Sequence, residues 1–333
     1  MRVETLLLPA LLLLPACLPS ESLVLTPDSG SSTGYFRVEP DPEEHASAEA
    51  TAILGSLIDD EGEFGFHYGR VDPDLEVRDL AVGGTDLGDM LEGTDDFGLR
   101  FMSHLVYDPY GDIADPVDPQ LERVEALAPT LVLCTDTYGN DVISAILGDD
   151  GIDPGDITDA ETLLPALEEL VTRLAETGAD SFLANVPRPS LLPAMPDRRR
   201  YTIGLLRDEA VAEGVDPDVA EAEATAEVDA RIVEIDAIAE STNEALDELA
   251  ASEPNVHVVD LFTEFDRLVE EGLTVGGQTL TARRYGGIVT LDGLHFSDTG
   301  YGILANIFLD AIDAELGGVP SRVDLEAVIT GDR

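Results

Sequence analysis

Residues 131–142 read LVLCTDTYGNDV, an apolar run that passes directly into a polar turn. An apolar run without alternation is typical of a strand buried on both faces of a parallel sheet. Parallel strands need crossover connections, usually helices, so this stretch predicts an α/β protein. Because ligands collect at the carboxyl ends of strands in such a sheet, the polar turn also indicates where a site can form.

Strand and helix patterns alternate along the rest of the chain. Apolar runs predict further strands at residues 23–25, 75–82, 181–186 and 256–262. Amphipathic patterns predict helices at residues 163–176, 218–250 and 303–311. Residues 186–201 and 272–287 read as loops. The alternation favours a single α/β domain over residues 18–333, because no strong boundary signal divides it.

The charge balance excludes one class of partner. The chain has 69 acidic residues against 18 basic ones, all of them Arg, and a net charge of -51. Such a charge argues against nucleic-acid binding, because the phosphate backbone would be repelled. The acidic residues are scattered along the chain, which suits a solvated shell in a high-salt medium. We interpret the charge as an adaptation of the surface and not as a function.

The two cysteines predict different environments. Residues 1–17 contain an apolar segment after Arg2 and end in LPAC, which is similar to the lipobox of bacterial lipoprotein signal peptides. The segment is too short to span a bilayer, so we expect cleavage before Cys17, lipid anchoring there and an exported protein. An N-terminus that is not cleaved is the alternative. Cys134 lies in the apolar run and is expected to be buried, so no disulfide framework is predicted.

Three predicted strands end next to candidate polar groups. Ser29 lies in the turn TPDSGSSTG of residues 26–34, which suits either a nucleophile or a flexible linker. Gly84 follows residues 75–82, where a glycine serves a tight turn or presents a backbone N–H to a ligand. Asn140 is either a helix N-cap or an amide donor to a developing oxyanion.

The fourth candidate is a pair near the C-terminus. Residues 290–301 read TLDGLHFSDTGY, with Asp292 three residues before His295 on a turn that leads into a helix. A nearby carboxylate can hold one histidine tautomer and stabilise the imidazolium formed during proton transfer. An ordinary polar loop is the alternative. Four polar features after successive strands favour an enzyme over a binding module.

The order of these features resembles the SGNH hydrolases, also called the GDSL esterase/lipase family. The final block is the closest match, in LDGLH of residues 291–295 followed by Gly300-Tyr301. LAVGGT of residues 80–85 is similar to the second block. GND of residues 139–141 is similar to the third, with Tyr138 in place of its first glycine. The first block is the weakest, because PDSG of residues 27–30 replaces its glycine and leucine.

The resemblance implies a three-layer α/β/α sandwich with a mainly parallel five-stranded sheet, of the flavodoxin-like kind. It implies a serine ester hydrolase in which Ser29 is the nucleophile, His295 the base and Asp292 the orienting acid. The oxyanion hole would consist of the Ser29 and Gly84 N–H groups and the Asn140 amide. No cofactor or metal is implied. The substrate would be a small-molecule, lipid or carbohydrate ester.

Other interpretations remain open from the residues alone. Ser31 lies in the same turn as Ser29 and is a second candidate nucleophile. The protein is alternatively a noncatalytic binding lipoprotein that has lost the first block. A third class is a metal-dependent phosphodiesterase or phosphatase, for which Asp136 and Asp141 would be the ligands.

Overall fold

The main sheet consists of parallel strands. The structure is a computed structural model that describes residues 85–94, 119–318 and 321–330, and the backbone of five short strands between residues 22 and 70. Its four-stranded sheet has the order β1-β6-β7-β8. The strands are β1 (Ser22–Leu25), β6 (Leu131–Cys134), β7 (Asp180–Ala184) and β8 (Val256–Val259). The register pairs Leu25 with Cys134 and Cys134 with Leu183, all in parallel. The α/β prediction is therefore confirmed, while the strand predicted at 75–82 lies outside the described residues.

Three small antiparallel pairs accompany the main sheet. They are β2 (Phe36–Val38) with β5 (Tyr68–Arg70), β3 (Leu57–Ile58) with β4 (Phe64–Gly65), and β9 (Leu273–Val275) with β10 (Gln278–Leu280). The last pair corrects the loop expected at residues 272–287. Gly276 and Gly277 lie between β9 and β10 with φ of 55° and 80°. Two successive positive φ angles match the right-handed twist of a hairpin, so these glycines permit the turn.

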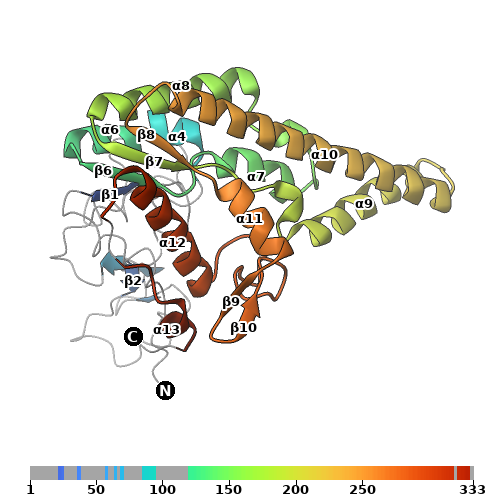
Figure 1. Ribbon diagram of the computed structural model, residues 1–333. Coiled ribbons are helices and arrows are strands. Elements are labelled where there is room, and N and C mark those ends of the chain that lie inside the picture. Colours follow the sequence, from blue (N-terminus) through green and yellow to red (C-terminus); the bar gives the residue numbers. More distant parts are fainter. Residues whose placement is uncertain are drawn as a thin grey trace.

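Helices cover both faces of the sheet. On one face, α8 (Ala160–Thr177) and α10 (Pro217–Ala250) pack against alternate strand residues such as Val132, Cys134 and Leu183. On the other face, α12 (Asp298–Glu315) packs against the intervening residues, including Leu133 and Phe182. Figure 1 shows α8 and α12 on opposite sides of the strands. Because both faces are covered, β6 is apolar and buried at all four positions and not only at alternate ones.

The remaining helices are shorter or lie beyond the sheet. They are α4 (Leu87–Glu92), α6 (Gln120–Leu127), α7 (Gly139–Leu147), α9 (Met195–Ala212), α11 (Leu261–Glu270) and α13 (Leu325–Thr330), with 3-10 turns η2 (Pro154–Asp156) and η3 (Pro189–Leu191). Both α7 and α11 begin just after strands, β6 and β8, and lie beyond their carboxyl ends (Figure 1). Within the described part of the chain, no helix combines the length and apolarity of a membrane span.

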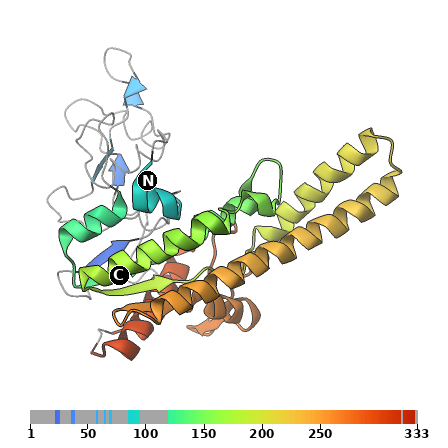
Figure 2. The same cartoon turned by 90° about the horizontal axis from the view of Figure 1, so that it is seen from above.

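Helices α9 and α10 form an antiparallel arm. Their connected ends project well past the sheet, as Figure 2 shows. The arm corrects the loop expected at residues 186–201, because α9 begins at Met195. Helix α9 buries only Met195, Thr202 and Ile203, so it has no continuous apolar stripe that a sequence pattern could reveal.

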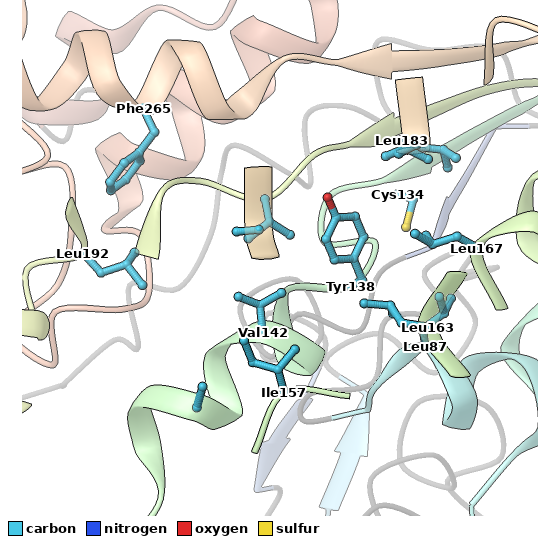
Figure 3. Packing of buried hydrophobic residues seen from close by; sticks show 14 of the residues in the cluster. Leu87, Cys134, Tyr138, Val142, Ile157, Leu163, Leu167, Leu183, Leu192 and Phe265 are labelled. Atoms are coloured by element: carbon cyan, nitrogen blue, oxygen red, sulfur yellow. The ribbon is translucent and has the colours of Figure 1, made fainter. Parts of the chain in front are cut away.

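A buried amide joins α10 to the segments that follow β6 and β7. Asn243 Oδ1 accepts hydrogen bonds from the Val186 N–H at 2.9 Å and from the Tyr138 hydroxyl. Its Nδ2 donates to the Val186 carbonyl at 3.0 Å. Figure 3 shows the Tyr138 hydroxyl among apolar side chains such as Val142 and Leu183, and this burial raises the pKa of the phenol. Both segments are therefore held at fixed positions on α10.

We predict that Asn243→Ala lowers the free energy of unfolding by about 3 kcal/mol, because it leaves both backbone groups of Val186 buried without partners. Tyr138→Phe removes one hydroxyl and leaves both Val186 bonds in place, so it should cost about 1 kcal/mol. Urea denaturation of the two variants and the wild type measures the difference. Equal losses would show that the amide does not hold Val186 in solution.

Candidate active site

The structure brings the predicted pair into direct contact. His295 Nδ1 lies 2.7 Å from Asp292 Oδ2. The two residues belong to a tight turn, in which the Gly293 N–H donates to the Thr290 carbonyl at 3.1 Å. The Thr290 N–H donates to the His295 carbonyl at 2.8 Å and closes the turn from the other side. The turn therefore sets the orientation of the imidazole through its backbone as well as through the carboxylate.

Asp292 is held as an anion. Its burial would raise its pKa, but hydrogen bonds from Thr290, His295 and the backbone lower that pKa to about 2. Asp292 Oδ1 accepts from Thr290 Oγ1 at 2.5 Å, from the Leu294 N–H at 2.9 Å and from the His295 N–H at 3.1 Å. One carboxylate oxygen thus fixes the turn, while the other contacts the imidazole. Thr290 has a role here that the sequence reading did not assign.

The residues after His295 anchor the turn to the core. Phe296 makes edge contacts with Phe265 of α11 and Tyr301 of α12, with ring centroids 6.3 and 5.8 Å apart. Ser297 caps α12 by accepting from the Gly300 N–H at 3.1 Å. Its hydroxyl also donates to the Gly287 carbonyl at 2.6 Å. The predicted turn into a helix is confirmed, and it places His295 at the start of a rigid element.

Asn140 is not the cap of its helix. The N-cap of α7 is Tyr138, and the Gly139 N–H is bound by Asp136 Oδ1 at 2.6 Å. The N-cap interpretation of Asn140 is therefore wrong. Asn140 lies in the first turn, and its side-chain amide donates to the Thr85 carbonyl at 2.7 Å. Its amide thus faces the segment before α4 that begins at Thr85.

Asp141 serves the fold. Its Oδ2 accepts from the Leu87 N–H at 2.9 Å, and its Oδ1 accepts from Thr158 Oγ1 at 2.6 Å. Burial raises the pKa of this carboxyl, although both hydrogen bonds oppose that shift. Asp141 therefore joins α7 to α4, while Asp136 caps α7. Among the described residues, no three His, Cys, Asp or Glu side chains are grouped to hold a metal ion.

Asn140 and His295 line the same pocket, which has a volume of about 160 Å³. It lies at the carboxyl ends of the parallel strands, since Thr135 and Asp136 after β6 and Asn185 after β7 also line it. Asn185 binds the Phe262 N–H at 2.7 Å and so joins β7 to α11. The strand predicted at residues 181–186 includes Asn185, whereas the observed β7 ends at Ala184, so Asn185 comes directly after the strand and lines the site.

The other predicted site residues lie outside the described part of the chain. These are Ser29 with its alternative Ser31, Gly84 and Cys17. Two residues close to them in sequence, Leu25 and Thr85, are described by the structure. Leu25, four residues before Ser29, is paired in parallel with Cys134, so β1 and β6 end at the same edge. Thr85, the residue after Gly84, contacts Asn140.

The prediction that Cys134 is buried is confirmed, because Cys134 is fully buried and its burial raises its pKa to about 12.

The start of α9 contacts both sides of the pocket. Gly293, at a φ of 81°, packs so closely that an added Cβ would lie 2.5 Å from the Ala194 nitrogen. The Ala194 N–H also donates to the Gly293 carbonyl at 3.2 Å. One turn later, Arg198 Nε donates to the Ile146 carbonyl near the end of α7 at 2.5 Å, and its guanidinium also binds the Gly148 carbonyl. The N-terminal end of α9 therefore contacts both the Asp292–His295 turn and the helix that carries Asn140.

No protein-family model, curated protein or solved structure matches this chain. A function has to be argued from the residues that meet at the pocket.

We predict that Gly293→Ala destabilises the protein more than Gly178→Ala does. Both glycines have φ near 80°, but nothing lies within 4 Å of an added Cβ at Gly178. The backbone strain of a left-handed alanine, about 1–2 kcal/mol, is common to both variants. The contact with Ala194 should add about 1–3 kcal/mol to the first. Thermal and urea unfolding of the pair measure the difference, and equal losses would contradict the contact.

We expect the Asp292 carboxyl to titrate at about pH 2. A lowered pKa stabilises the folded state above the ordinary Asp value of about 4, and this stabilisation is lost as the pH falls through about 2. Thr290→Val removes one hydrogen bond to the carboxylate, so the titration should move to higher pH. Carbon-detected NMR of the carboxyl group measures both midpoints. Thr279→Val, at an exposed position on β10, is the control and should leave the midpoint unchanged.

Proposed function

We propose that this protein is a serine ester hydrolase that resembles the SGNH family. The observation that carries the proposal is the meeting of the Asp292–His295 pair and the Asn140 amide at one pocket. A base oriented by a carboxylate and an amide donor for an oxyanion are two of the three parts that acyl transfer needs. The third part, the nucleophile, is Ser29 in this proposal.

The mechanism follows from the orientation of His295. Because Nδ1 contacts Asp292, Nε2 is the nitrogen that accepts the Ser29 proton as the serine oxygen bonds to the ester carbonyl carbon. The carbonyl oxygen becomes an oxyanion, held by the Ser29 and Gly84 N–H groups and the Asn140 amide, at about 3 kcal/mol of barrier reduction for each donor. When the C–O bond breaks, the alcohol leaves with the proton from His295. Water then repeats the cycle on the acyl-serine and releases the acid.

The strand order supports the finer fold assignment. The observed β1-β6-β7-β8 order corresponds to the 1-3-4-5 part of the flavodoxin-like order 2-1-3-4-5. In this proposal, residues 75–82 form the fifth strand beside β1, and Gly84 follows its carboxyl end. The contact between Thr85 and Asn140 favours this arrangement.

The proposed enzyme is exported and lipid-anchored at Cys17 after removal of residues 1–16, as the LPAC motif suggests. Its substrate is a small-molecule, lipid or carbohydrate ester. The mechanism requires no metal or cofactor. The noncatalytic alternative keeps the same fold and pocket, and differs only in lacking a reactive serine.

Labelling with a fluorophosphonate probe tests the proposal. The probe should modify one serine, identified by mass spectrometry as Ser29, because only a serine activated by a base reacts at neutral pH. His295→Ala should lose both the labelling and the hydrolysis of p-nitrophenyl butyrate. His257→Gln is the matched histidine control, since His257 lies on β8 beside Asp180 and Glu315 and does not line the pocket. It should retain both activities.

Three outcomes would overturn parts of the proposal. Labelling of Ser31 would move the nucleophile by two residues and leave the reaction class unchanged. A folded protein that reacts neither with the probe nor with esters would favour the noncatalytic binding protein. Full ester turnover in His295→Ala would remove the assignment of the base.

A further inference from the structure

One face of α7 leads away from the catalytic groups. Asn140, Ile143 and Leu147 are spaced three and four residues apart, so they share a helix face, and all three line the pocket. At 1.5 Å of rise per residue, this face is about 10 Å long from Asn140 to Leu147. Ile143 is partly buried, whereas Leu147 is 42% exposed. The face is therefore polar at the catalytic end, apolar beyond it and open to solvent at its far end.

The opposite side of the pocket is also apolar. It is lined by Val186 and Pro187 after β7 and by Phe265 of α11. Phe265 lies on α11, and both α7 and α11 lie beyond the strand ends (Figure 1). The polar lining groups at the strand ends, such as Asn185, come directly after strands. The pocket thus combines polar groups next to the strand ends with apolar groups on α7 and α11.

The lining of the pocket favours a neutral apolar ligand over an anion or a sugar. Of the described residues that line it, none is Arg, and Asp136 is the acidic one. An anionic group would therefore meet a carboxylate without a compensating cation. The side chains of Ile143, Leu147 and Phe265 offer no hydrogen bonds to the hydroxyls of a sugar placed against them. A neutral aliphatic chain has neither cost.

We infer that the α7 face binds the aliphatic acyl chain of a neutral ester, in the range from butanoyl to octanoyl. This inference rests on the proposed function. The ester carbonyl lies at Asn140 and His295, and the chain follows Ile143 to Leu147. The length of the face sets the number of methylenes that gain contacts. Because Leu147 is open to solvent, longer chains extend past it into water and gain no further contact.

The chain-length profile of p-nitrophenyl esters tests the inference. Each methylene buried along the face should raise kcat/KM about fourfold, which corresponds to ~0.8 kcal/mol. The rise should run from acetate to about octanoate and then level off. A profile that is highest at acetate would overturn the inference, and so would one that falls sharply after butyrate.

Two leucine variants locate the chain. Leu147→Ser should lower the ratio of octanoate to acetate turnover about tenfold, because it removes the apolar contact at the far end of the face. Leu164→Ser is the matched control, since Leu164 is also a helical leucine, is 40% exposed and does not line the pocket. It should leave the ratio unchanged. Equal ratios in the two variants would overturn the placement along α7.

Binding of 1-octanol separates this inference from the proposed function. Calorimetry on the wild-type protein and on Leu147→Ser measures occupancy of the face without any reaction. A protein that hydrolyses no ester but binds octanol, more weakly after Leu147→Ser, would refute the hydrolase and support the aliphatic pocket. A protein that hydrolyses esters with no dependence on chain length, and whose octanol binding is unaffected by Leu147→Ser, would support the hydrolase and refute the pocket.

Discussion

The pocket depends on one buried amide. Asn243 binds both backbone groups of Val186 and the Tyr138 hydroxyl, so α10 holds the segments that follow two neighbouring strands. Tyr138 is the N-cap of the helix that carries Asn140, and Val186 lies in the pocket wall. Leaving the buried Asn243 amide without its hydrogen-bond partners would cost more free energy than its hydrogen bonds contribute when they are made. Displacement of Val186 or Tyr138 from Asn243 is therefore unfavourable. The rigidity of the wall around Asn140 follows from that cost.

The two sides of the pocket are fixed by different means. On the side of Asn140, the contacts are hydrogen bonds between elements far apart in sequence, such as that from Leu87 to Asp141. On the side of His295, a local turn arranges the pair through Asp292 and Thr290. The position of Asn140 therefore depends on the whole fold, whereas the orientation of His295 is encoded within a few neighbouring residues. The sequence predicts the Asp292–His295 contact on the local side, although not the part that Thr290 plays in it.

The features predicted from sequence are those with a local signal. Apolar runs predict strands at the positions of all four strands of the main sheet, and the clearest run is β6, which is buried at every position. The Asp292–His295 contact followed from its spacing. Helix α9 was missed because it is fixed by Arg198 and Thr202 hydrogen bonds and not by an apolar stripe. The Asn243 interactions join residues 57 and 105 positions apart, which no periodicity reveals. Ser29, Gly84 and Cys17 remain predictions.

Helix α9 has a mechanical consequence. At its start, α9 contacts Gly293 through Ala194 and the Ile146 carbonyl of α7 through Arg198. From there its 18 residues extend about 27 Å to the outer end of the arm. Together with α10, it forms the arm that projects past the sheet (Figure 2). A displacement of the arm would therefore act first on the two segments that the start of α9 contacts, the turn at Gly293 and the end of α7.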